Sequence, residues 1–153
     1  MKSRTYFLIC LVLLSAAMLT PAKSIAADGD AGESQKVVIH LSHFTDDIHA
    51  CFMALKVANL LQEQGASVTI FLDLEGVRLA ARRQALAFTW GADSPPLSQY
   101  YDEFTKGGGK ILLCPHCAKS AKLNDPGLKR NAELATTAAL GKMLLDADKV
   151  IDY

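Results

Sequence analysis

The stretch Lys110–Lys122, KILLCPHCAKSAK, places two cysteines directly after a short apolar run. The run Ile111–Leu113 predicts a buried strand, and the small and basic residues that follow Cys117 favour a helix. In an open α/β sheet, ligands bind at the carboxyl ends of the strands. The N-terminus of a helix also lowers the pKa of a thiol, because its free N–H groups favour the thiolate. Position and residue type together predict a reactive thiol site formed by Cys114 and Cys117.

The rest of the chain alternates between strand-like and helix-like segments. We expect strands at residues 36–42, 67–72, 111–113 and 149–153, and helices at 48–64, 99–105 and 132–145, with a helical segment also entered after residue 73. The first strand is almost continuously apolar, which is typical of a parallel sheet covered on both faces. Strand–helix–strand units close into parallel pairs. The pattern therefore predicts a single α/β domain with a mostly parallel sheet.

The N-terminal residues have the pattern of a secretory signal peptide. Basic residues 2 and 4 precede an apolar run over residues 6–19, and small residues follow up to Ala27. The run is shorter than the roughly 20 residues that a membrane-spanning helix needs. We therefore predict a signal that is cleaved after Ala26, with Ala27 as the close alternative.

The predicted signal peptide divides the chain into three segments and indicates where the mature protein is located. Residues 1–26 form the signal peptide, 27–35 a flexible lead-in and 36–153 the α/β domain. The expected location is the periplasm or the outside of the cell, with no membrane span after cleavage. The 16 basic and 16 acidic residues balance, so the composition favours no nucleic-acid partner.

A Cys-x-x-Cys motif is typical of a redox disulfide, half of a metal site or a structural bridge. In an oxidising compartment the pair must form a disulfide, bind a metal or be kept active by a partner. His116, between the two cysteines, favours the thiolate of the first. A thioredoxin fold does not fit, because that fold needs a cis-proline loop after the motif and no proline follows Pro126.

A metal site is the alternative from a different class. His43 lies in the loop after the first expected strand, and His49 starts the following helix. Together with Cys114 and Cys117 they would give a set of ligands suited to zinc, or a soft site for copper. The spacing matches no standard zinc module. If Cys114 and Cys117 act instead as reactive thiols, no cofactor is required.

Other candidate residues have simpler interpretations. His40 is expected to pack in the core and Cys51 to be a small buried hydrophobic residue. Trp90 is expected to pack inside the domain or at a subunit contact. Three arginines could bind an anion such as thiosulfate, but a solvated helix face is the preferred interpretation; they are Arg78, Arg82 and Arg83.

Several blocks in order resemble the DsrE/DsrF-like (TusD/YchN-like) family over nearly the whole mature chain. They are VVIHLS and ALKVANLLQEQGASVTIFL, the turn at residues 75–77, GGGKILLCPHCAKSAKL, and the closing LLDADKVIDY. The resemblance implies a flavodoxin-like three-layer fold with a mostly parallel sheet of about five strands. It also implies a homo-oligomer, a trimer or a hexamer.

The resemblance further implies a persulfide on the cysteine after the third strand, which is Cys114 here, with Cys117 as its neighbour. The partners would be a protein or a small sulfur compound that donates or accepts sulfur. Relay members of the family work in the cytoplasm, whereas this chain carries a predicted export signal. The expected function is an exported persulfide carrier or sulfurtransferase-type relay that uses Cys114, Cys117 and His116. Metal binding and thiol–disulfide redox chemistry stay open as alternatives, and the sequence does not decide whether the protein is an enzyme.

Overall fold

The computed structural model describes residues 33–153, so the predicted signal peptide and most of the predicted lead-in lie outside it. Strands and helices alternate along this part of the chain. In order they are β1 (Lys36–Leu41), α1 (Ile48–Glu63), β2 (Ser67–Leu72), the 3₁₀ helix η1 (Leu74–Ala80), α2 (Leu97–Lys106), β3 (Lys110–Leu113), α3 (Pro115–Ser120), the 3₁₀ turn η2 (Asp125–Gly127), β4 (Ala132–Leu134), α4 (Thr137–Asp146) and β5 (Lys149–Asp152).

The five strands form one sheet in the order β4-β3-β2-β1-β5. Every pairing is parallel, and the register between β1 and β2 sets His40 beside Phe71. The predicted α/β fold with a parallel sheet of about five strands is confirmed. Because all strands point the same way, the residues that follow β1, β2, β3 and β5 gather at one edge of the sheet.

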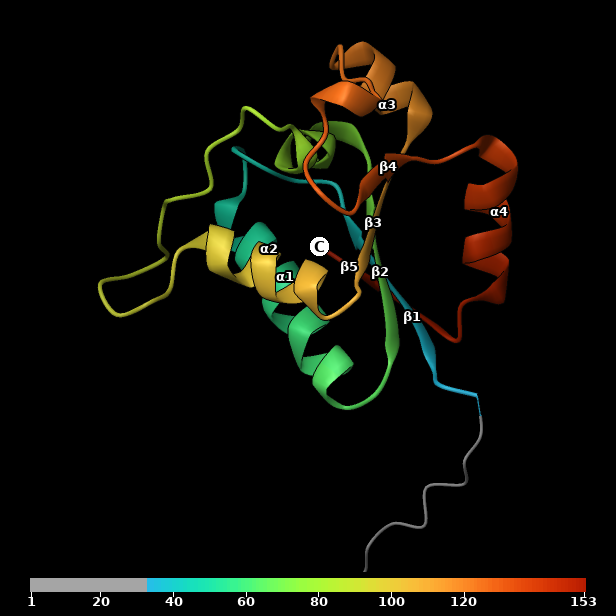
Figure 1. Cartoon of the computed structure of the whole chain (residues 1–153), viewed down its shortest axis with the longest axis horizontal. Coiled ribbons are helices and arrows are strands. Elements are labelled where there is room, and N and C mark those ends of the chain that lie inside the picture. The colour runs from blue at the N-terminus through green and yellow to red at the C-terminus, as the bar shows by residue number, and fades with distance from the viewer. Residues whose placement is uncertain (1–32) are drawn as a thin grey trace, which may run out of the picture. The chain divides into compact units, whose positions relative to one another are not determined.

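Helices cover both faces of the sheet, with α1 and α2 on one side and α4 on the other (Figure 1). Alternate residues of β1, namely Val37, Ile39 and Leu41, belong to the main core together with the apolar face of α1. The intervening residues Val38 and His40 therefore point toward the side of α4. No residue of α4 is fully buried, so the larger core lies under α1 and α2.

Helix α1 begins and ends where its sequence predicts. The carboxylate of Asp47 accepts a hydrogen bond from the N–H of Ala50 at 3.0 Å, which satisfies one of the free donors of the first turn. After the helix, Gly65 adopts a φ of 87°, a left-handed conformation that glycine adopts without steric cost. An aspartate cap and a glycine in the left-handed conformation therefore mark the two ends of this helix.

Three segments differ from the sequence-based expectation. The helix expected from residue 132 is preceded by strand β4, and it starts only at Thr137, where the hydroxyl of Thr136 caps it by accepting from the N–H of Ala139. Helix α2 starts at Leu97, after Pro96, two residues before the expected start at residue 99. The segment after β2 is a 3₁₀ helix that ends at Ala80, so Arg82 and Arg83 lie beyond it.

Within residues 33–153, no helix is both long enough and apolar enough to cross a membrane.

Candidate functional site

Strand β3 delivers Cys114 to the carboxyl edge of the sheet, at the start of α3. Cys114 occupies the N-cap position and Pro115 the first helical position, where the missing N–H of proline costs nothing. The N–H of Cys114 donates to the carbonyl of Leu72 at 2.8 Å, and its carbonyl accepts from Ala118 at 2.9 Å. The backbone of Cys114 is thus fixed to β2 and to its own helix, and the predicted order of strand, Cys114 and helix is confirmed.

Cys117 lies in the first turn of α3, close enough to Cys114 for that thiol to affect its pKa. Both thiols are partly exposed. Burial raises the pKa of Cys117, the N–H of Leu74 lowers it, and the proximity of Cys114 and Asp73 raises it again. The net pKa of Cys117 is above its usual value, so this residue is held as a thiol beside Cys114.

Leu74 supplies that N–H from an unusual backbone conformation. Its φ is 39°, in the left-handed region that residues with large side chains rarely occupy. Its side chain is 64% exposed, so side-chain burial does not explain this conformation. Such outliers gather at functional sites, where the surrounding structure holds them in place.

A polar network lies beside the thiols and was not predicted. Nδ1 of His40 lies 2.7 Å from Oδ1 of Asp152, and Nε2 lies 3.1 Å from Oδ1 of Asp73. The hydroxyl of Ser42 donates to the same oxygen of Asp73 at 2.7 Å. The imidazole also stacks on Phe71, with ring centroids 5.1 Å apart. His40 is therefore a half-buried histidine between two carboxylates, and the expectation of an ordinary packed core histidine is wrong.

Asp73 connects this network to the cysteines, because it bonds to His40 and its charge acts on Cys117. The residues come from the carboxyl ends of β1, β2 and β5. The sequence does show a polar residue at the end of each apolar strand. In a parallel sheet such residues lie at the same edge, so this pattern could have indicated the network. What the sequence could not show is that β5 lies next to β1, which brings Asp152 to His40.

The other predicted site residues lie apart from this cluster. His116 is exposed on α3. Nδ1 of His43 contacts Oδ2 of Asp46 at 2.6 Å, and the ring of His49 stacks on Trp90 with centroids 4.1 Å apart. Trp90 itself is 53% exposed. It stacks on His49 at the surface of the domain. Burial inside the domain was one of its two expected positions, and the structure does not show it.

The four ligands of the metal alternative are not assembled. Over residues 33–153, no three His, Cys, Asp or Glu side chains are grouped so that they could hold a metal ion. His43 and His49 are engaged with Asp46 and Trp90, as described above, and not with the cysteines. The donor set that the alternative requires does not fit this structure.

Cys51 has the properties of an inert core thiol. Its side chain is fully buried and donates to the carbonyl of His43 at 3.3 Å. Burial raises the pKa of Cys51 to about 12. The expectation of a small buried hydrophobic residue is confirmed, and Cys114 and Cys117 are the accessible thiols of residues 33–153.

The His40 network makes stability depend on pH. Burial by itself lowers the pKa of His40, but the hydrogen bonds to Asp152 and Asp73 outweigh it, and the net pKa is raised. The stabilisation is therefore complete below about pH 6.5, the ordinary pKa of histidine, and is lost as the pH rises through the higher folded pKa. We expect urea unfolding at pH 8 to give a lower free energy of unfolding than at pH 6. The network's part of the loss stays below about 1 kcal/mol, because Asp152 is largely exposed.

The variant His40→Gln should flatten this pH dependence. His43→Gln is the matched control, because the pKa of His43 is also raised but its ion pair with Asp46 is exposed and screened. The assignment of the pH dependence to the His40 network would be contradicted if His40→Gln left the slope of unfolding free energy against pH unchanged while His43→Gln flattened it.

A parallel α/β domain with a thiol pair at the carboxyl edge of its sheet is the class that the fold and the site define. The model of the DsrE/DsrF-like family matches residues 35–153. The chain belongs to the DsrE/DsrF-like family, as its sequence blocks predicted. A comparison of the sequence with curated proteins finds no match.

Solved structures with the same fold come from distant organisms. The ychN protein from E. coli superposes with a TM-score of 0.65 at 21% identity, over 79% of this chain and 100% of that one. MTH1491 from Methanobacterium thermoautotrophicum gives 0.60 at 15% identity, over 78% of this chain and 100% of that one. BT1422 from Bacteroides thetaiotaomicron superposes with a TM-score of 0.58 at 16% identity, over 78% of this chain and 95% of that one. At these identities the likeness concerns the fold.

Proposed function

We propose that this protein is an exported sulfur carrier of the sulfurtransferase type that holds sulfur as a persulfide on Cys114. The observation that carries the proposal is the pair of partly exposed thiols that lie together at the start of α3. Membership of the DsrE/DsrF-like family supports it, because the family includes sulfur-relay proteins. The predicted signal peptide supports an exported location, the periplasm or the outside of the cell, in this proposal.

Loading would be a displacement at sulfur. The thiolate of Cys114 attacks the terminal sulfur of a donor that contains a sulfur–sulfur bond. A new Cys114–sulfur bond forms, the donor's sulfur–sulfur bond breaks, and the shortened donor leaves with the electron pair. Delivery is the same reaction in the other direction, in which an acceptor nucleophile takes the outer sulfur and Cys114 leaves as a thiolate.

Cys117 offers a second way to release the sulfur. Its thiol loses its proton and attacks the inner sulfur on Cys114, which forms a Cys114–Cys117 disulfide and releases hydrosulfide. A dithiol reductant is then needed to restore the two thiols. The raised pKa of Cys117 fits this later role, because a protonated thiol does not compete with Cys114 for the donor.

The partners in this proposal are a sulfur donor and a sulfur acceptor, either protein or small molecule, and further copies of the chain in a trimer or hexamer. No resident cofactor takes part. The zinc or copper alternative loses support because its four ligands are not assembled.

The test is the intact mass of the protein purified from its exported location without reductant. We expect the mass of the chain plus one sulfur atom, with the extra sulfur removed by a dithiol reductant. A mass lower by two hydrogens is also the disulfide that release through Cys117 leaves, so the deciding measurement is the same mass for the variant Cys117→Ser, which cannot form it. If that variant carries no sulfur that a dithiol reductant removes, carriage is contradicted and a redox or structural disulfide is favoured. A metal retained in the native mass would favour the metal alternative.

A further inference from the structure

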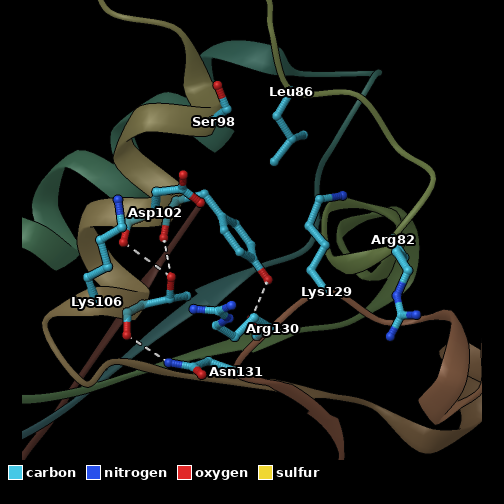
Figure 2. Close-up of a pocket in the computed structure, with 10 residues that line it drawn as sticks. Arg82, Leu86, Ser98, Asp102, Lys106, Lys129, Arg130 and Asn131 are labelled. Carbon is cyan, nitrogen blue, oxygen red and sulfur yellow. Dashed lines mark hydrogen bonds between the residues drawn. The ribbon is translucent and has the colours of Figure 1, made fainter.

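A second feature lies away from the thiols, between α2 and the segment before β4. It is a pocket of about 710 Å³, within the range of small-molecule sites. Its lining residues are Arg82, Leu86, Ser98, Tyr101, Asp102, Thr105, Lys106, Lys129, Arg130 and Asn131. None of them belongs to the thiol site or to the His40 network. In Figure 2, Asp102 and Lys106 come from α2 on one side, Arg82 lies on the opposite side, and Lys129 and Arg130 lie between them.

The pocket concentrates positive charge in a chain whose charges balance. Four cationic side chains line it, against one carboxylate, that of Asp102. Within residues 33–153, none of Arg82, Lys106, Lys129 and Arg130 takes part in an ion pair. Like charges held close together repel one another. A negatively charged ligand would relieve that repulsion.

Two of the cations are held in place by the backbone. The Nζ of Lys129 donates to the carbonyls of Ala81 and Gln84, the second at 2.8 Å. The Nε of Arg82 donates to the carbonyl of Leu128 at 3.1 Å, and its terminal N–H groups make no hydrogen bond in the described part of the chain. Burial lowers the pKa of Lys129 to about 8. Burying the charged form of Lys129 costs free energy, yet the structure fixes its ammonium group at this pocket. An anion bound there would offset that cost.

The floor of the pocket is buried and ordered. Tyr101 and Leu86 are 4% and 5% exposed. The hydroxyl of Tyr101 donates to the carbonyl of Arg130 at 3.2 Å, and the amide of Asn131 donates to the carbonyl of Thr105 at 2.7 Å. These bonds tie the segment that carries Lys129 and Arg130 to helix α2. The pocket is therefore preformed, with an apolar base and a cationic rim.

We propose that this pocket binds a small organic molecule that carries phosphate groups. Two guanidinium groups match the oxygen pairs of phosphate, and two ammonium groups add charge around them. The buried Leu86 and Tyr101 provide a surface for the organic part of the ligand. This proposal is independent of the thiol chemistry, and its test reads binding alone.

The experiment is isothermal titration calorimetry of the purified protein with pyrophosphate, adenosine diphosphate, adenosine and citrate. We expect saturable binding of the first two with a Kd below about 1 mM, and none of adenosine. The double variant Lys106→Gln/Arg130→Gln should weaken binding about tenfold or more. The side chains of Lys106 and Arg130 make no hydrogen bond within residues 33–153, so both can be replaced without loss of a structural contact.

The matched control is Lys56→Gln/Lys149→Gln, which removes two charges from exposed positions outside the pocket. It should bind like the unmodified protein. Equal weakening in the control would show non-specific attraction, and undiminished binding in the pocket variant would place the ligand elsewhere. Either result would overturn the proposal, as would tighter binding of citrate than of pyrophosphate, or no binding of either phosphate probe.

Discussion

Replacing Cys114 with serine is expected to abolish sulfur loading while leaving the fold intact. A serine hydroxyl cannot form the sulfur–sulfur bond, so the whole of the loaded mass should disappear. Serine is among the preferred residues at a helix N-cap, which is the position that Cys114 occupies. The measurement is intact mass after the reduced protein is incubated with inorganic polysulfide and the excess is removed.

Two matched variants separate the roles of the other cysteines. Cys117→Ser should keep or increase the sulfur on Cys114, because the thiol that resolves the persulfide is gone. Cys51→Ala should load like the unmodified protein, because that thiol is fully buried. Sulfur retained on Cys117 in the Cys114→Ser variant would reverse the two roles. If the unmodified protein never loads, the carrier proposal itself fails.

Replacing Gly76 with alanine is expected to be the most damaging small change in the domain. A Cβ at Gly76 would lie 2.2 Å from the carbonyl oxygen of Leu41 and 3.0 Å from its carbonyl carbon. Both are backbone atoms of β1, an interior strand paired on both sides, which cannot move aside without disturbing the sheet. The N–H of Gly76 also donates to the carbonyl of Ser42 at 3.0 Å. We expect a loss of about 3 kcal/mol in the free energy of unfolding.

Urea unfolding followed by circular dichroism gives that free energy. Gly141→Ala is the matched control, because it is the same chemical change in α4, where a Cβ meets nothing within 4 Å. The free energy of unfolding of Gly141→Ala should be higher by about 0.5–1 kcal/mol, because alanine has a higher helix propensity than glycine. If Gly76→Ala and Gly141→Ala changed stability alike, the close approach of η1 to β1 would not matter for folding.

Much of the fold could be predicted because its elements are locally encoded. The helix at α1 has apolar residues at helical spacing, a capping aspartate and a terminating glycine, and all three agree with the structure. Strand β4 was missed because it is only three residues long, and because Leu134 also fits the helical spacing of the segment after it. The start of α4 depends on the cap at Thr136, which that spacing does not reveal.

The thiol pair could be predicted, but its surroundings could not. Cys114 and Cys117 are close in sequence, and a strand followed by a helix is enough to place them. The His40 network joins residues that are 112 positions apart, and only the position of β5 beside β1 brings them together. The same limit applies to the cationic pocket, which is lined by residues as distant in sequence as Arg82 and Arg130.

The strand order also has a consequence for the time course of folding. Strand β1, near the start of the domain, receives its last neighbour from β5, whose residues are among the final ones of the chain. The sheet therefore cannot be completed until β5 has been synthesised, after the other four strands. Contacts between such distant parts of a chain slow folding, because a long loop must close first. A nascent chain of this topology has an incomplete sheet until β5 is present, and the carboxylate of Asp152 reaches the site only with that strand.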